Sequence, residues 1–273
     1  MNRFILPGCV IGLTLLTPAR AELEPASVAS LSPTDLIEYE SQPPAVQQLI
    51  EEALSLTKKG LTYQFGSNSP ENPGMDCSGT VQFTLKEAGV NQVPRSSYTM
   101  FKWAEEEGML VDTRGVTTTE DPVFDPIQPG DLLFWEGTYD TGDRDPPISH
   151  VMLYLGRLKE DGRGVVFGAS DGRRFRGKRI HGVSVFDWRV PPEGSSSKFV
   201  AFGPVPGLVG EEGRPPRSGV EAEISVGSPS ENAGEMAGGE ASEAPTATAE
   251  ARPSGGSQKK PFKPLRFLEK VFR

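Results

Sequence analysis

The residues best suited to chemistry are one cysteine and two histidines. Cys77 stands in the run Asp76-Cys77-Ser78-Gly79, which follows a loop rich in Asn, Pro and Gly and opens a segment of helical periodicity. A helix N-terminus carries a partial positive charge and free N–H groups, which favour a thiolate and can stabilise an oxyanion. The position predicts a nucleophile for acyl transfer; the alternative is a buried structural cysteine.

A thiol nucleophile needs a base within hydrogen-bond reach. His150 directly precedes the apolar run 151–156, so its ring is expected at the mouth of a hydrophobic strand, facing a cleft. A strand-edge histidine without a role is the alternative, and His181 is the weaker candidate for a base. These few histidines and cysteines have no spacing typical of metal ligands, and we expect no metal and no cofactor.

The elements that must position these groups follow a simple order. Helical periodicity covers about 44–58, 77–88 and 98–107, and 62–66 is a short extended piece. Strands are expected at 132–135, 150–155, 165–169, 182–188 and 198–202, with polar loops at 112–125 and 136–147. Helices first and strands later predict an α+β fold, with N-terminal helices on a mainly antiparallel sheet of five to six strands.

The N-terminus is typical of an exported protein. Residues 1–21 carry Arg3, then an apolar run, then the small-x-small site Ala19-Arg20-Ala21. This pattern predicts a signal peptide cleaved near Ala21 and a protein exported to the periplasm, the cell envelope or the medium. An uncleaved anchor and lipidation at Cys9 are the alternatives. Cleavage would leave Cys77 as the one cysteine, with no internal disulfide.

The rest of the chain divides by composition. We expect a spacer at 22–42, a folded domain at 43–206, a disordered low-complexity linker at 207–258 and a basic amphipathic tail at 259–273. The tail could contact an anionic membrane or wall polymer, or could be a solvated end. The net charge of −9 argues against a nucleic-acid partner, and we expect a monomer.

Five motifs, in order, resemble those of the NlpC/P60 family: the segments 61–66, 76–79, 93–97, 128–135 and 149–156. The resemblance implies a papain-like fold and a cysteine peptidase that cleaves peptidoglycan stem peptides, often between D-glutamate and diaminopimelate or lysine. It implies that Cys77 attacks the scissile carbonyl and that His150 takes the thiol proton. A non-catalytic or weakly active wall-binding member is the alternative, and an amidase or acyltransferase of related shape is a third candidate.

The same resemblance implies a set of substrate-binding residues. Tyr63 would sit over the oxyanion, Asp76 and Ser78 would meet the amino end of the stem peptide, and Arg95 and Ser97 would line the cleft. Simpler roles remain open for four of them: Tyr63 in the core, Asp76 as a helix cap, Ser78 in the first turn and Arg95 on the surface.

One position departs from the family pattern. A third polar residue normally orients the catalytic histidine, and its place falls on Gly168, which has no side chain. Ser170, Asp171, His181 or a backbone carbonyl are the candidates to replace it. Loss of an orienting group usually weakens such a site without abolishing it.

Overall fold

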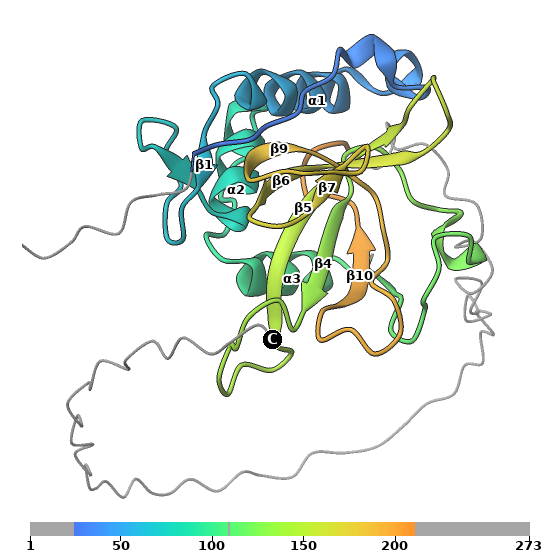
Figure 1. Ribbon diagram of the computed structural model, residues 1–273. Coiled ribbons are helices and arrows are strands. Elements are labelled where there is room, and N and C mark those ends of the chain that lie inside the picture. Colours follow the sequence, from blue (N-terminus) through green and yellow to red (C-terminus); the bar gives the residue numbers. More distant parts are fainter. Residues whose placement is uncertain (1–24, 109, 211–273) are drawn as a thin grey trace, which may run out of the picture. The chain divides into compact units, whose positions relative to one another are not determined.

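The computed structural model describes residues 25–108 and 110–210 (Figure 1). The predicted signal peptide at 1–21, nearly all of the predicted linker and the whole predicted tail at 259–273 lie outside these residues and stay predictions.

Three α-helices occupy the first half of the described chain: α1 (Pro44–Thr57), α2 (Cys77–Glu87) and α3 (Ser97–Glu106). Each lies where the spacing of apolar residues predicts it, and each buries that apolar stripe. Short 3-10 turns cover Pro33–Asp35, Tyr39–Ser41 and Pro122–Phe124. Within the described residues, no helix combines the length and apolar character that a membrane crossing needs.

The strands form one principal sheet, in the order β3 (Val111–Asp112), β10 (Lys198–Gly203), β4 (Leu132–Glu136), β5 (Ile148–Arg157), β6 (Gly164–Ser170) and β9 (Gly182–Asp187). Every neighbouring pair is antiparallel. The predicted α+β class is confirmed. Two small pairs lie outside this sheet: β1 (Thr62–Tyr63) with β2 (Gly74–Met75), and β7 (Arg174–Phe175) with β8 (Lys178–Arg179).

The strand of the candidate base is longer than the sequence suggested. It was expected to start at His150, but β5 begins at Ile148. Trp135 pairs with His150 whereas Glu136 pairs with Ile148, so Ser149 is an extra residue in the ladder. Such a bulge bends the strand locally and re-aims its side chains. It lies directly beside His150.

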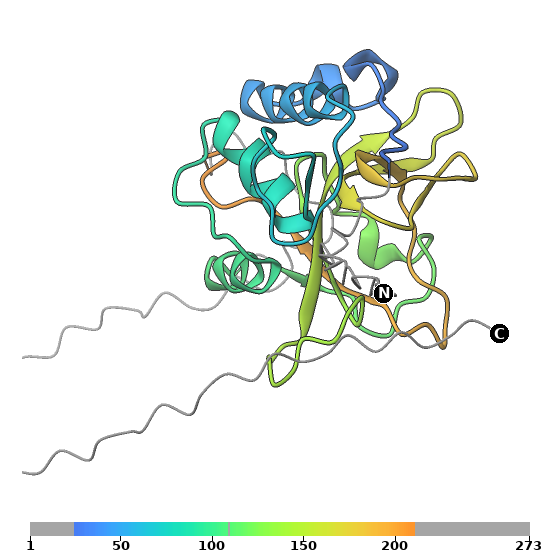
Figure 2. The same ribbon diagram turned by 60° about the vertical axis from the view of Figure 1, so that its left-hand side comes forward.

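The two faces of the sheet differ in what covers them. On one face, Phe101 of α3 packs edge-on against Phe134 at 5.3 Å between ring centroids. Neighbouring side chains of a strand point to opposite faces, so Trp135 lies on the other side, against Phe199 and Trp188. Figures 1 and 2 show α2 and α3 packed beside β5.

The segment 22–42 is not a spacer in its described part, so that prediction is wrong for 25–42. Ser27 pairs with His181 and Leu36 with Leu158. The amide of Ala29 donates to the Ser184 hydroxyl at 2.7 Å, and Leu36 is fully buried. Single apolar residues anchor this segment at wide intervals, and these carry no helical or strand periodicity that the sequence could reveal.

Candidate active site

The first turn of α2 is fixed by the residues around Cys77. Asp76 caps the helix, accepting a hydrogen bond from the Gly79 amide at 2.6 Å. Its other carboxylate oxygen accepts from the Gly66 amide at 2.9 Å. A Cβ on Gly79 would lie 2.2 Å from the carbonyl oxygen of Ser67. The Asp-Cys-Ser-Gly run is therefore explained by a cap at its start and a close backbone approach at its end.

Arg95 completes a polar cluster on this side of the site. Its guanidinium grips the Asp76 carboxylate with two hydrogen bonds, at 3.1 and 2.7 Å, and donates to the Ser78 hydroxyl at 3.0 Å. Asp76 and Ser78 are buried. The structure thus brings together three of the predicted substrate-binding residues. The carboxylate of Asp76 already accepts hydrogen bonds from two amides, the Ser78 hydroxyl and one arginine, which is what a structural cap requires.

Cys77 lies where two strands separate. The β5–β6 ladder runs from Arg157 and Gly164 to Leu153 and Phe167, so the start of β5 is not paired with β6. The start of α2 fills this place, and the backbone N–H groups of Val151 and Ser78 interact with the sulfur. Because Val151 follows His150, the sulfur contacts the backbone next to the base candidate.

The protonation state of Cys77 differs from the sequence-based expectation. A helix N-terminus was expected to lower the thiol pKa. Instead burial, aided by the Asp76 carboxylate, raises the pKa of Cys77 to about 11, while the nearby N–H groups and Arg95 act in the lowering direction. The side chain is only 6% exposed. Desolvation outweighs the helix terminus, so the free protein holds a neutral thiol at neutral pH.

His150 is also buried and electrically neutral. Burial first, and then the positive charge of Arg173, hold the pKa of His150 well below its ordinary value. Its ring lies edge-on to Trp135, with centroids 5.6 Å apart. The Nε2 atom is buried and has no hydrogen-bond partner within the described part of the chain. The imidazole can accept a proton, but no side chain of residues 25–108 or 110–210 orients it through Nε2.

Gly168 explains the missing partner. A Cβ placed on Gly168 would lie 3.1 Å from the terminal methyl of Met152, so Met152 fills the space that a side chain at this position would need. Of the candidate replacements, Asp171 is exposed and His181 is held by Ser27 through paired backbone hydrogen bonds. Ser170 is buried at the end of β6. None donates to or accepts from Nε2 of His150.

Tyr63 and Ser97 lie close to the same centre. Burial, followed by the negative charges of the Cys77 thiolate and Asp76, holds the pKa of Tyr63 well above its ordinary value, which places its hydroxyl near both. Ser97 is buried, and its hydroxyl points at the carbonyl of Ile148 at 3.5 Å. Tyr63 thus lies near the nucleophile, whereas Ser97 supports the start of β5.

Two polar loops meet beside the site. Phe65, which is 73% exposed, packs edge-on against Tyr139 with ring centroids 5.9 Å apart. Phe65 belongs to the loop before Cys77, and Tyr139 belongs to the enlarged loop before His150. The aromatic pair links these loops and marks a boundary of the site.

Arg173 was not singled out from the sequence. It follows the end of β6, and its guanidinium lies over the Trp135 ring at 4.2 Å. The sequence offered one indication: β6 runs antiparallel to β5, so the residues after its end must return to the start of β5, near His150. A basic residue there necessarily enters the site.

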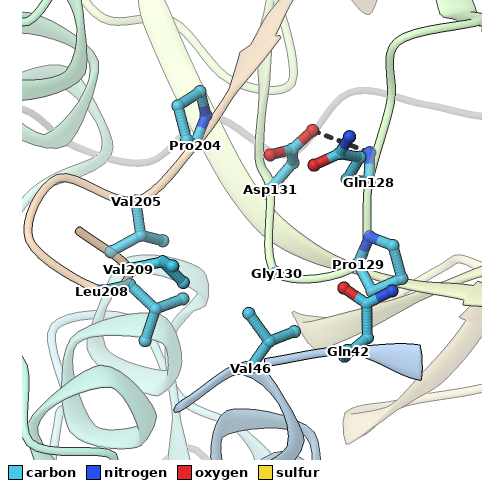
Figure 3. Close-up of a pocket in the computed structure, with 10 residues that line it drawn as sticks. All are labelled: Gln42, Val46, Gln128, Pro129, Gly130, Asp131, Pro204, Val205, Leu208 and Val209. Atoms are coloured by element: carbon cyan, nitrogen blue, oxygen red, sulfur yellow. Dashed lines mark hydrogen bonds between the residues drawn. The ribbon is translucent and has the colours of Figure 1, made fainter. Parts of the chain in front are cut away.

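Two depressions elsewhere are not this site. The small cavity of about 30 Å³ in Figure 3 is lined by residues of α1, the turn before β4 and the segment after β10, among them Val46, Gly130 and Leu208. Packing of Leu208 there carries the folded part past the predicted boundary at 206. A larger depression of about 950 Å³ is lined by the 117–121 loop and Trp188. Neither includes Cys77 or His150, and 30 Å³ is too small for a peptide.

The described residues contain no group of three or more His, Cys, Asp or Glu side chains that could hold a metal ion. The groups gathered at this centre are a thiol, an imidazole, two arginines and backbone amides.

Part of the chain matches known proteins. Residues 60–181 match the model of the NlpC/P60 family. A gamma-DL-glutamyl hydrolase of Bacillus subtilis is 33% identical over 97 residues, which are 36% of this chain and 18% of that protein. The bifunctional muramidase/DL-endopeptidase CwlT of the same organism is 32% identical over 110 residues, which are 40% of this chain and 26% of that protein. The chain thus spans about a quarter or less of these relatives.

Two solved structures are also similar. A lipoprotein-like protein of the NLP/P60 family from Staphylococcus aureus is 25% identical, with a TM-score of 0.33, over 52% of this chain and 36% of that one. The peptidoglycan hydrolase RipB from Mycobacterium tuberculosis is 24% identical, with a TM-score of 0.33, over 60% of this chain and 69% of that one.

The described residues place a thiol at the start of α2 and an imidazole on strand β5 of an α+β domain. The family match covers this arrangement, from the loop before Cys77 to the start of β9. This segment, somewhat less than half of the chain, is similar to the NlpC/P60 family.

Proposed function

We propose that the protein is a cysteine endopeptidase that hydrolyses peptide bonds in peptidoglycan stem peptides. One observation carries the proposal: within a segment that matches the family, the Cys77 sulfur lies against the backbone next to His150. The names of the two Bacillus relatives, a gamma-DL-glutamyl hydrolase and a DL-endopeptidase, support a glutamyl bond as the target, and the family resemblance suggests the D-glutamyl–diaminopimelate type.

The geometry supports a mechanism that starts from two neutral groups. His150 takes the thiol proton as the Cys77 sulfur attacks the scissile carbonyl, and the tetrahedral oxyanion forms beside the first amides of α2. The imidazolium then protonates the leaving amine, and the C–N bond breaks. Water, deprotonated by His150, hydrolyses the thioester and releases the carboxylic acid. We propose that the Tyr63 hydroxyl, which lies near Cys77, contacts the oxyanion.

Substrate recognition would use the residues around this pair. Asp76, Ser78 and Arg95 form a polar wall beside the nucleophile. We propose that the amino end of the stem peptide approaches this wall, where the outer side of the Arg95–Asp76 pair remains accessible. Arg95 is 38% exposed through its side chain, whereas the Asp76 side chain is 8% exposed. Ser97 would act indirectly, because its hydroxyl points at the carbonyl of Ile148 at the start of β5.

A binding-only or weakly active member is the second candidate. Gly168 supplies no orienting group, Nε2 of His150 has no partner within the described chain, and the Cys77 thiol is held neutral. An imidazole without an orienting partner spends less time in the productive geometry, which lowers the rate of proton transfer. This candidate predicts binding to peptidoglycan without fragment release.

Mass spectrometry of peptidoglycan digested with the mature protein separates the two. We expect stem-peptide fragments with the wild type and none with Cys77→Ala, a loss of about 10⁴-fold or more, as for other nucleophile deletions. The cleaved bond is read from the fragment masses. A wild type that releases no fragments would leave the binding role. Release by Cys77→Ala at the wild-type rate would rule out this nucleophile.

The proposed location follows from the sequence. Export after cleavage near Ala21 would bring the enzyme to its substrate, and the basic tail at 259–273 would add contact with an anionic membrane or wall polymer.

A further inference from the structure

Arg173 has an unusual environment for an arginine of this protein. Among the described residues, its guanidinium forms no hydrogen bond and no ion pair. Every other arginine in that part of the chain donates to a carboxylate or a carbonyl oxygen: Arg95, Arg114, Arg144, Arg157, Arg163, Arg174, Arg176, Arg179 and Arg189. A guanidinium has five N–H donors, and leaving them unmatched in a half-buried place is costly.

The position of the unmatched group is fixed by stacking. The guanidinium lies over the fully buried indole of Trp135 at 4.2 Å, and the same indole contacts the His150 ring. Stacking on an aromatic face holds a guanidinium in place and leaves its edge free to donate in its own plane. The donors of Arg173 are therefore held beside His150, and within the described residues they form no hydrogen bond.

The charge of Arg173 reaches both reacting groups. It contributes to the lowered pKa of His150, and the Cys77 thiolate in turn favours the charged form of Arg173. Burial lowers the pKa of Arg173 to about 10, so the group remains a cation at neutral pH. A fixed, unpaired cation next to a nucleophile that attacks peptides selects an anionic group on the peptide, which means a carboxylate.

We propose that Arg173 is a specificity-determining residue that binds a free carboxylate which the substrate carries beside the scissile amide. The inference rests on the proposed function and narrows its substrate class. In a γ-linked glutamyl bond the α-carboxylate is free on the acyl side, and a diacid such as diaminopimelate offers one on the leaving side. Either would match the planar guanidinium with two parallel hydrogen bonds.

Binding of that carboxylate also changes the base. Neutralising the Arg173 charge removes one of the two causes that depress the pKa of His150. His150 then accepts the thiol proton more readily when a carboxylate-bearing substrate is bound than when the site is empty. Recognition and base strength are thus coupled through one residue, which compensates in part for the side chain that Gly168 lacks.

Binding measured on an inactive protein tests the proposal apart from turnover. Four matched peptides carry either a carboxylate or a carboxamide on the γ-glutamyl residue and, independently, on the leaving-side residue. We expect mature Cys77→Ala protein to prefer a carboxylate at one position by about 10- to 100-fold in Kd, the range of a charge-assisted hydrogen-bonded pair. The preferred position identifies which carboxylate Arg173 binds.

Variants assign the preference to the residue. Arg173→Met keeps the apolar cover over Trp135 but removes the donors, and we expect it to abolish the preference, with Arg173→Lys in between. Arg174→Met is the matched control, because that exposed arginine donates to the Gly177 carbonyl, and it should keep the full preference. Equal binding of all four peptides, or a preference retained by Arg173→Met, would overturn the inference. A preference with no hydrolysis by the wild type would instead overturn the proposed function alone.

Discussion

Two clusters of polar side chains flank Cys77, and they differ in how many of their hydrogen-bonding atoms have partners. On one side, Asp76, Ser78 and Arg95 satisfy one another and cap α2. On the other, the described chain offers no partner to Nε2 of His150, to the indole N–H of Trp135 or to the Arg173 guanidinium. A buried polar group without a partner costs about 1–3 kcal/mol. Stability is therefore concentrated on the first side, and unsatisfied hydrogen-bonding capacity, which a substrate can use, on the second.

The largest expected effect comes from a substitution on the unmatched side, at His150. His150→Ala removes the proposed base, and we expect kcat/KM for a stem-peptide substrate to fall by about 10²–10⁴-fold, the usual contribution of a general acid–base group. His181→Ala is the comparison: its backbone pairs with Ser27, and it should change the rate by about tenfold at most. Steady-state kinetics on both proteins makes the test. An equal loss at His181 would mean that His181 also serves the reaction.

The next effect measures the charge state of the nucleophile. Burial raises the pKa of Cys77 to about 11, so the thiolate fraction of the free protein should rise about tenfold per pH unit from neutrality up to that value. The rate of alkylation by iodoacetamide, followed by mass spectrometry between pH 7 and 10, should rise by about 10³-fold in step.

Cys77 is the one cysteine after the predicted cleavage site, so Cys77→Ser serves as the blank for this measurement. A rate that is already maximal near pH 7 would show that an ion pair with His150 forms before substrate binds. His150 would then already be paired with a charge in the free protein, and the contrast between the matched and the unmatched side of Cys77 would weaken.

The sequence was informative wherever local chemistry decides the structure. The helix start at Cys77 follows from Asp76, which is a typical capping residue. The need for glycine at position 79 is visible only in the fold, where the Ser67 carbonyl approaches its backbone closely. The strand carrying His150 was predictable from its apolar run, but the bulge at Ser149 was not, because ladder register depends on the partner strand.

Long-range packing set the limit of prediction. Residues 25–42 are ordered because Leu36 pairs with Leu158, which lies far along the chain. The pKa of Cys77 depends on how much protein covers it, which a motif does not encode. The role proposed for Arg173 depends on two features that the sequence does not encode. Its guanidinium lies over Trp135, and it forms no hydrogen bond within the described residues.

The smallest of these effects tests the matched side. Asp76→Ala removes the cap of α2 and leaves the Arg95 guanidinium without its carboxylate. Because Arg95 is partly exposed, water recovers some of the loss, and we expect the free energy of unfolding to fall by about 2–3 kcal/mol. Urea denaturation of the mature protein provides the measurement.

Asp112→Ala is the matched control for that variant. Asp112 also pairs with an arginine, Arg114, at 2.6 Å, but both side chains are well exposed, and such a pair contributes about 0–1 kcal/mol. A loss at Asp76 no greater than that at Asp112 would mean that the buried cluster does not stabilise the fold. The contrast between a matched, stabilising side and an unmatched side of Cys77 would then fail, because Asp76 would hold α2 in place no better than an exposed ion pair does.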